Sequence, residues 1–146
     1  MTILAVQTAL FRRMIEYGPL TALLAKDARF PGSPAIYDHV PQEADSGNDA
    51  AFPYVVIGAD RFSEWDTDDS QGFEVKVTIH AWSRQKGRAE IKRIQQEIYN
   101  ALHRFELEVE GAKVVTLQQG FAESFVEPDG ITRHGVQEYH LILDNV

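Results

Sequence analysis

The sequence predicts an α+β fold, in which one antiparallel sheet carries two main helices on one face and has long loops at its ends. Apolar residues recur at spacings of three and four in only two long segments, residues 2–17 and 88–104. The other apolar runs alternate with polar residues or are rich in β-branched and aromatic types, as strands are. These runs cluster instead of taking turns with helices, which favours α+β over α/β.

The first helix is predicted over residues 2–17. Thr2 can cap its start, and Gly18-Pro19 ends it. A shorter helical turn is expected around residues 20–26. The face of the first helix that is expected to be buried comprises Ile3, Val6, Leu10, Phe11 and Met14.

Two strands are predicted in the front half of the chain, over residues 35–40 and 54–59. A polar stretch at residues 42–51 separates them. The clearest strand is residues 73–82, because Val75, Ile79 and their alternate neighbours are apolar while the residues between them are polar. An acidic connection, residues 60–72, is expected to lead into it.

The second helix is predicted over residues 88–104, where Ile91, Ile94, Ile98 and Leu102 share one face. It is expected to pack on the same face of the sheet as the first helix. The remaining strands are expected at residues 107–109, 113–117, 122–126 and 136–143, with turns at Glu110-Gly111 and Pro128-Asp129-Gly130.

The bulk composition limits the classes of function. A chain of 146 residues fits one domain, residues 1–146. Fourteen Lys and Arg against 22 Asp and Glu give a net charge of −8, which opposes general binding to nucleic acid. Cysteine is absent, so disulfides, thiolate metal sites and thiol catalysis are excluded. No apolar run is long enough to predict a membrane span.

Catalytic motifs are also missing from the sequence. There is no glycine-rich phosphate loop and no G-x-S-x-G nucleophile elbow, so we expect neither an enzyme nor a cofactor. His80 and His140 lie on predicted central strands and could be neighbours across the sheet. They could form a metal or acid–base site, but the ligand spacing for metal is absent, and half-exposed strand residues are the simpler interpretation.

Two charged segments are candidate contact regions, because they flank residues 73–82 and so project in opposite directions. An acidic segment can meet a basic one on a neighbouring subunit, although both can also be solvated loops. Trp65 either packs back onto the core or awaits a partner. The candidate contact residues are Asp60, Trp65, Asp66, Asp68 and Asp69 in the acidic segment, and Arg84, Lys86 and Arg88 in the basic turn.

Taken in order, several short motifs resemble the tail-terminator, or tail-completion, proteins of long-tailed bacteriophages. The resemblance covers about residues 36–143. The motifs that carry it are YDHVP at 37–41, FPYVVIG at 52–58, Trp65 with Thr67, HAWS at 80–83 followed by Gly87, and DG at 129–130 with RHGV at 133–136.

The resemblance implies a structural subunit that forms a hexameric ring, terminates the tail tube and joins it to the neck. It implies tail-tube and neck proteins as partners, and a place in the virion after assembly in the bacterial cytoplasm. Three alternatives remain at this point: another head–tail joining subunit, a small α+β ligand-binding domain, and a nucleic-acid module. The first shares folds with tail terminators, the second requires a concave site, and the third conflicts with the net charge.

Overall fold

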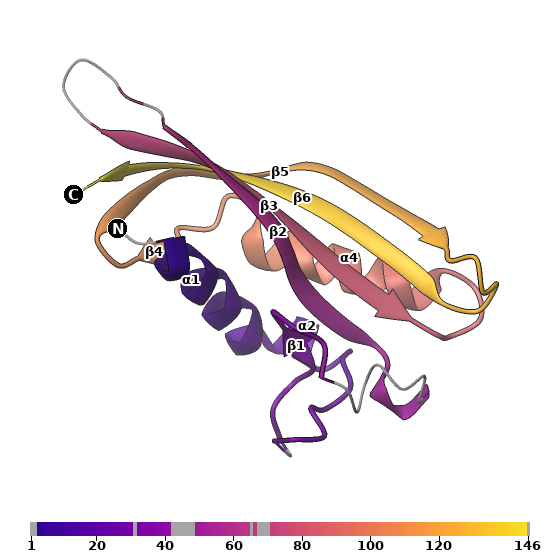
Figure 1. Cartoon of the computed structure of the whole chain (residues 1–146). Coiled ribbons are helices and arrows are strands. Elements are labelled where there is room, and N and C mark those ends of the chain that lie inside the picture. Colours follow the sequence, from indigo (N-terminus) through magenta and orange to yellow (C-terminus); the bar gives the residue numbers. More distant parts are fainter. Residues whose placement is uncertain (1–2, 31, 42–48, 65, 67–70, 146) are drawn as a thin grey trace.

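The computed structural model describes residues 3–30, 32–41, 49–64, 66 and 71–145. Figure 1 shows a long twisted sheet with helices on one side. The elements in chain order are α1 (Ile3–Glu16), α2 (Gly18–Thr21), β1 (Ile36–Tyr37), the 3₁₀-helix η1 (Asp49–Ala51), β2 (Tyr54–Glu64), β3 (Gly72–Ser83), α4 (Ala89–Leu102), β4 (Glu108–Val109), β5 (Ala112–Val126) and β6 (Arg133–Asn145).

The sheet has six strands in the order β1-β2-β3-β6-β5-β4. All neighbours pair antiparallel except β1 and β2, which run parallel through Ile36 with Val55 and Tyr37 with Val56. The α+β class is therefore confirmed, but the expectation of a wholly antiparallel sheet is wrong, because the sheet is mixed. The chain leaves β1 and returns to start β2 beside it in the same direction, which a tight hairpin cannot do.

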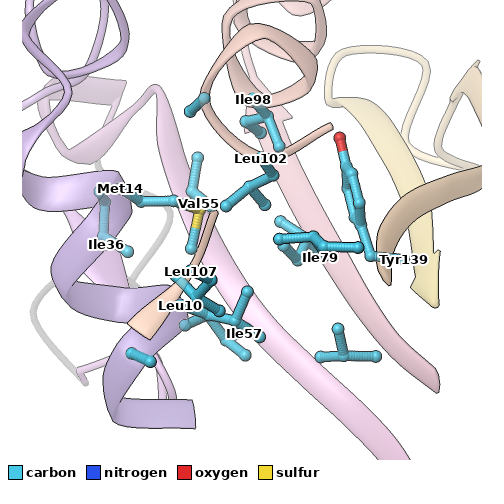
Figure 2. Close-up of a cluster of buried hydrophobic side chains, with 14 of the residues drawn as sticks. Leu10, Met14, Ile36, Val55, Ile57, Ile79, Ile98, Leu102, Leu107 and Tyr139 are labelled. Carbon is cyan, nitrogen blue, oxygen red and sulfur yellow. The ribbon is translucent and has the colours of Figure 1, made fainter. Parts of the chain in front are cut away.

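Both main helices lie on the same face of the sheet, as predicted (Figure 1). Leu10 of α1 and Ile94 of α4 are fully buried in one hydrophobic core. Figure 2 shows side chains of α1 and α4 meeting those of the sheet in this core. The labelled members are Leu10, Met14, Ile36, Val55, Ile57, Ile79, Ile98, Leu102, Leu107 and Tyr139.

Several strands are longer than the sequence predicted. β2 continues to Glu64, so Asp60 lies in a strand and not in the loop expected at residues 60–72. A register shift between Ile57 and Asp60 lets the strand bend, after which Phe62 pairs with Val75 and packs against the core. Similarly, the strands expected at residues 113–117 and 122–126 are one strand, β5, because a shift between Gln119 and Phe121 absorbs Gly120.

The helices are amphipathic, and none among the described residues is long and apolar enough to span a membrane. α4 buries five residues on the face toward the sheet, while Lys92 and Arg93 stay exposed. The opposite face of the sheet has no helix over it in Figure 1. We call this face the open face.

Candidate assembly surface

The open face is built by the polar half of the alternation along the strands. On β3 the residues that point away from the core are Glu74, Lys76, Thr78, His80 and Trp82, while Val75, Val77, Ile79 and Ala81 are buried. The side of β3 that the sequence marked as polar is therefore the side that a partner can reach.

Four rings form a row straight across the open face, near the end where β3 stops. The register pairs Tyr54 with Trp82, Trp82 with His134, and His134 with Phe125, so the row crosses β2, β3, β6 and β5. Ring centroids are 6.3 Å apart for Tyr54 and Trp82, 3.7 Å for Trp82 and His134, and 4.9 Å for His134 and Phe125. The row stiffens the sheet across its width, because cross-strand aromatic pairs add to sheet stability.

A chain of hydrogen bonds runs beside this row. Nδ1 of His134 lies 2.7 Å from Oε1 of Glu127, and Nε2 of His134 lies 2.7 Å from Nδ1 of His80. Burial lowers the pKa of both imidazoles; the charge of His134 lowers the pKa of His80 further, while Glu127 raises that of His134. If both rings are neutral, each hydrogen bond has one donor and one acceptor. The Nδ1–H of His134 donates to Glu127, and the Nδ1–H of His80 donates to Nε2 of His134.

The partner of His80 is thus His134 and not His140, so the predicted pairing of His80 with His140 is wrong. In the observed register His140 is opposite Lys76, four residues along β3 from His80, and Nε2 of His140 lies 2.6 Å from Oε1 of Glu138. The His80 ring lies over Gly58, where an added Cβ would come within 2.7 Å of Cδ2 of His80. Only glycine at this position leaves room for the ring.

A groove of about 520 Å³ lies between the aromatic row and the β5–β6 turn. Its walls include Tyr54, His80 and Trp82, and its rim includes Glu127 and Asp129. The Thr132 hydroxyl and the N–H groups of Thr132 and Ile131 donate to the Asp129 carboxylate and lower its pKa to about 2. The Asp129 carboxylate therefore holds the turn together.

The side chains that line this groove bear on what it could bind. Within the described parts of the chain, no group of three or more His, Cys, Asp or Glu side chains is placed to hold a metal ion. The polar groups at the rim bond to one another, and the walls are aromatic and apolar. The arrangement suits contact with a protein surface better than catalysis.

The predicted contact residues lie toward opposite ends of β3, except Asp60, which is opposite Val77 near the middle of the strand. Asp60 is exposed on β2, and Asp66 is exposed just beyond its end. Lys86 and Arg88 are exposed in the turn between β3 and α4. β3 has 12 residues, so the two ends lie about 40 Å apart and cannot meet within one chain. The other predicted members, Trp65, Asp68 and Asp69, lie outside the described residues.

Arg84 differs from the other two basic residues. Its guanidinium lies 2.9 Å from Asp49 Oδ1, donates to Thr132 Oγ1 at 3.3 Å, and sits 4.5 Å from the centroid of the Phe52 ring. The Arg84 side chain therefore links the end of β3 to η1 and to the β5–β6 turn within one chain. Lys86 and Arg88 are the cations of this turn that face solvent.

Comparison with known proteins gives this surface its context. The model of the family described as Tail completion protein gp17 matches residues 8–144, almost the whole chain. The chain belongs to this family. A tail completion protein gp17 of Bacillus phage SPP1 is 26% identical over 141 residues, which cover 97% of this chain and 93% of the relative.

The fold of this tail completion family member is also found in a solved particle. A chain in a structure titled "Virion of native gene transfer agent (GTA) particle" superposes with a TM-score of 0.79 and 19% identity, covering 96% of this chain and 95% of that one. At this identity the likeness shows the fold alone.

Sequence reasoning missed the aromatic row and the bond between His80 and His134. HAWS at 80–83 and RHGV at 133–136 stood out as motifs, but nothing in one sequence shows that they are neighbours. One signal was available in the sequence: each motif places an aromatic residue or a histidine at the end of a predicted strand. Such residues can be cross-strand neighbours when the two strands belong to one sheet, as Trp82 and His134 are.

Proposed function

We propose that this chain is a structural, non-catalytic subunit that completes a phage-type tail, by assembling into a ring that ends the tail tube and joins it to the neck. The observation that carries the proposal is the family match over residues 8–144. The alignment with the SPP1 tail completion protein, at nearly full length of both chains, supports the same role. The fold shared with a chain of a gene transfer agent virion agrees with a place in the particle.

A ring of identical copies requires that one surface of a subunit fit a different surface of the next. The acidic end of β2–β3 and the basic turn after β3 suit this requirement, since they carry opposite charges and lie about 40 Å apart. We infer that Lys86 and Arg88 of one copy face the acidic end of the next. Exposed ion pairs are worth only about 0.2–1 kcal/mol each, so they set the register while other contacts hold the ring.

Charge reversal in the exposed part of the basic turn tests the proposal. The change Lys86→Glu with Arg88→Glu should weaken ring assembly in sedimentation and leave the circular dichroism spectrum unchanged. Arg84 is kept, because its replacement would disturb η1 and the β5–β6 turn. A matched control is Lys92→Glu with Arg93→Glu on the exposed side of α4, which changes the net charge equally and should assemble normally.

Adding Asp66→Lys, Asp68→Lys and Asp69→Lys to the first variant should partly restore assembly. Unchanged assembly in the first variant, or no rescue in the second, would show that these ends do not pair. The ring itself has a separate test on purified tail tubes that lack this protein. A chain that remains monomeric and fails to bind such tubes would contradict the role in tail completion.

A further inference from the structure

Both outer strands of the sheet leave part of their length open. β1 pairs with β2 only at Val55 and Val56, and β4 pairs with β5 only at Ala112 and Lys113. Farther along β5, the Arg104 N–H donates to the Leu117 carbonyl, and the Gln119 N–H donates to Nδ1 of His103. Beyond these contacts no described strand pairs with residues 58–64 of β2 or 120–126 of β5 on their outer side. The backbone of this part of β5 also has a contact from outside the sheet, since Nε2 of Gln95 in α4 donates to the Glu123 carbonyl at 2.8 Å.

The open part of β5 combines two exposed aromatics with one charge. Phe121, Glu123 and Phe125 are opposite Glu138, Val136 and His134 of β6, so all three side chains lie on the open face. Phe121 is 45% exposed and Phe125 is 38% exposed. Glu123 is the only charged side chain on this part of the strand. Such a strand edge is suited to pairing with another strand.

Glu123 argues against pairing between two β5 edges. An antiparallel pair centred on Glu123 would place Phe121 opposite Phe125 of the other copy, which is favourable. The same register would place the two Glu123 carboxylates directly opposite each other, and like charges in that position are destabilising. The edge therefore favours a different strand, one that brings a cation opposite Glu123.

The open part of β2 carries such a cation. Arg61 is exposed, lies on the open face, and is opposite Lys76 in the β2–β3 register. Arg61 and Lys76 are two cations side by side, with Glu74 as the carboxylate that shares their pocket, so an added carboxylate opposite Arg61 would balance the second cation. Ser63, two residues farther along, lies on the same face opposite Glu74.

We propose that the open part of β5 in one copy pairs antiparallel with the open part of β2 in the next copy, with Glu123 opposite Arg61 and Phe121 opposite Ser63. This inference rests on the proposed ring and names a contact for it that is an alternative to the pairing of the charged ends. A shift of about 13 Å along the strands does not bring together ends that lie about 40 Å apart, so only one of the two contacts can hold. The strand directions permit it, because three successive antiparallel pairings make β2 and β5 run in opposite directions. The two strands also lie toward opposite sides of the sheet, as a head-to-tail contact requires.

The pairing also fixes a stagger between copies. Within one chain, the cross-strand register places Glu123 at the level of His80 on β3, through Val136 of β6. It places Arg61 at the level of Lys76, four residues away along β3. Successive copies would therefore be displaced along the strands by about 13 Å. This displacement leaves β1 and β4 outside the paired stretch, so neither short strand has to be removed.

Disulfide trapping tests the contact, because the chain has no cysteine of its own. Cα atoms of directly opposed antiparallel residues lie about 4.5–5.5 Å apart, within the range that a disulfide spans. Glu123→Cys with Arg61→Cys should give a ladder of dimers and larger multimers on a non-reducing gel under mild oxidation. Phe121→Cys with Ser63→Cys should do the same, since both pairs belong to one register.

The ladder can arise only between copies. Within one chain β6 and β3 separate β5 from β2, so the two positions lie at least about 14 Å apart. Each single-cysteine variant should stop at dimers. Glu123→Cys with Arg12→Cys is the matched control, because Arg12 is exposed on α1 and away from both edges, and it should give no ladder.

Sedimentation of the reduced double variant separates the two hypotheses. A ladder from both cysteine pairs, absent from the control, supports the β5–β2 contact. Rings in sedimentation without a ladder would overturn the contact and leave the proposed function intact. No self-association together with no ladder would overturn the contact and the ring alike.

Discussion

At the scale of single residues, the bond between His80 and His134 is the feature most sensitive to conditions. Both rings are partly buried among Val56, Trp82 and Phe125, and the carboxylates that face them are Glu127 and Glu123. One added proton can be shared with Glu127. A second proton would place two cations 2.7 Å apart and break the bond between the rings.

We therefore expect stability to fall as the solution becomes mildly acidic. The folded pKa of both histidines lies below the usual 6.5, so the folded state binds fewer protons than the unfolded chain. The contribution is fully present above about pH 6.5 and is lost as the pH falls from there through the lowered folded pKa. Thermal unfolding at pH 7.5 and at pH 5.5 measures this loss of stability. Each kcal/mol lost should lower Tm by about 2–4 °C.

The variant His80→Asn should lose less Tm than the natural chain between these two pH values. The control His39→Asn replaces an exposed histidine and should retain the full loss. Equal losses in all three proteins would show that other groups, and not the His80–His134 bond, set the pH dependence.

The sequence could not identify this bond, and the reason is the register. Both strands were predicted, and each was placed within three residues of its observed ends. The two strands are not joined by a short hairpin, so no turn fixes which residues are opposite. His140 was as reasonable a neighbour for His80 as His134, until the pairing of Trp82 with His134 was known.

At the scale of elements, apolar periodicity predicted the positions of the two main helices and the central strand well, but Ile3 and Phe11 of the expected buried face of the first helix are exposed. Charged strand ends were mistaken for loop. Residues 60–64 read as part of an acidic connection, yet they continue β2 by pairing with β3. An edge strand exposes its side chains even within the sheet, so its sequence carries little of the alternation that marks β3. Phe62 was the one apolar residue that could have shown the strand continuing.

The helix α4 gives a direct test of the core at this scale. Ile98 is fully buried between α4 and the sheet, and Ile98→Ala should lower the free energy of unfolding by about 2–5 kcal/mol through lost contacts and the cavity left behind. Chemical denaturation followed by circular dichroism measures the change. The control Lys92→Ala on the exposed side of the same helix should stay within about 0.5 kcal/mol; similar losses for both would contradict this account of the core.

At the scale of the whole molecule, the sheet separates a packed face from a face available to partners. The predicted arrangement of two helices on one face follows from their single apolar stripes and from the single apolar face of β3. The parallel β1–β2 pair was not predictable, because only two residue pairs define it and the polar stretch before β2 gives no sign of direction.

The same separation bears on chemistry. Aromatic rings and bonded carboxylates line the groove on the open face, so we expect the protein to bind no metal at functional stoichiometry. Elemental analysis of protein purified without a metal-affinity step measures this. One equivalent of zinc or iron per chain would contradict the expectation and would revive a ligand-binding function.

The open edge of β5 also has a consequence for the isolated subunit. A newly made subunit with free backbone groups beside Phe121 and Phe125 resembles the segments from which insoluble fibrils grow. Glu123 between the two rings acts as a gatekeeper, since stacking identical strands in register would stack its charge as well. The residue that we place at the contact between copies would thus also keep surplus subunits soluble while they wait for a tail to finish.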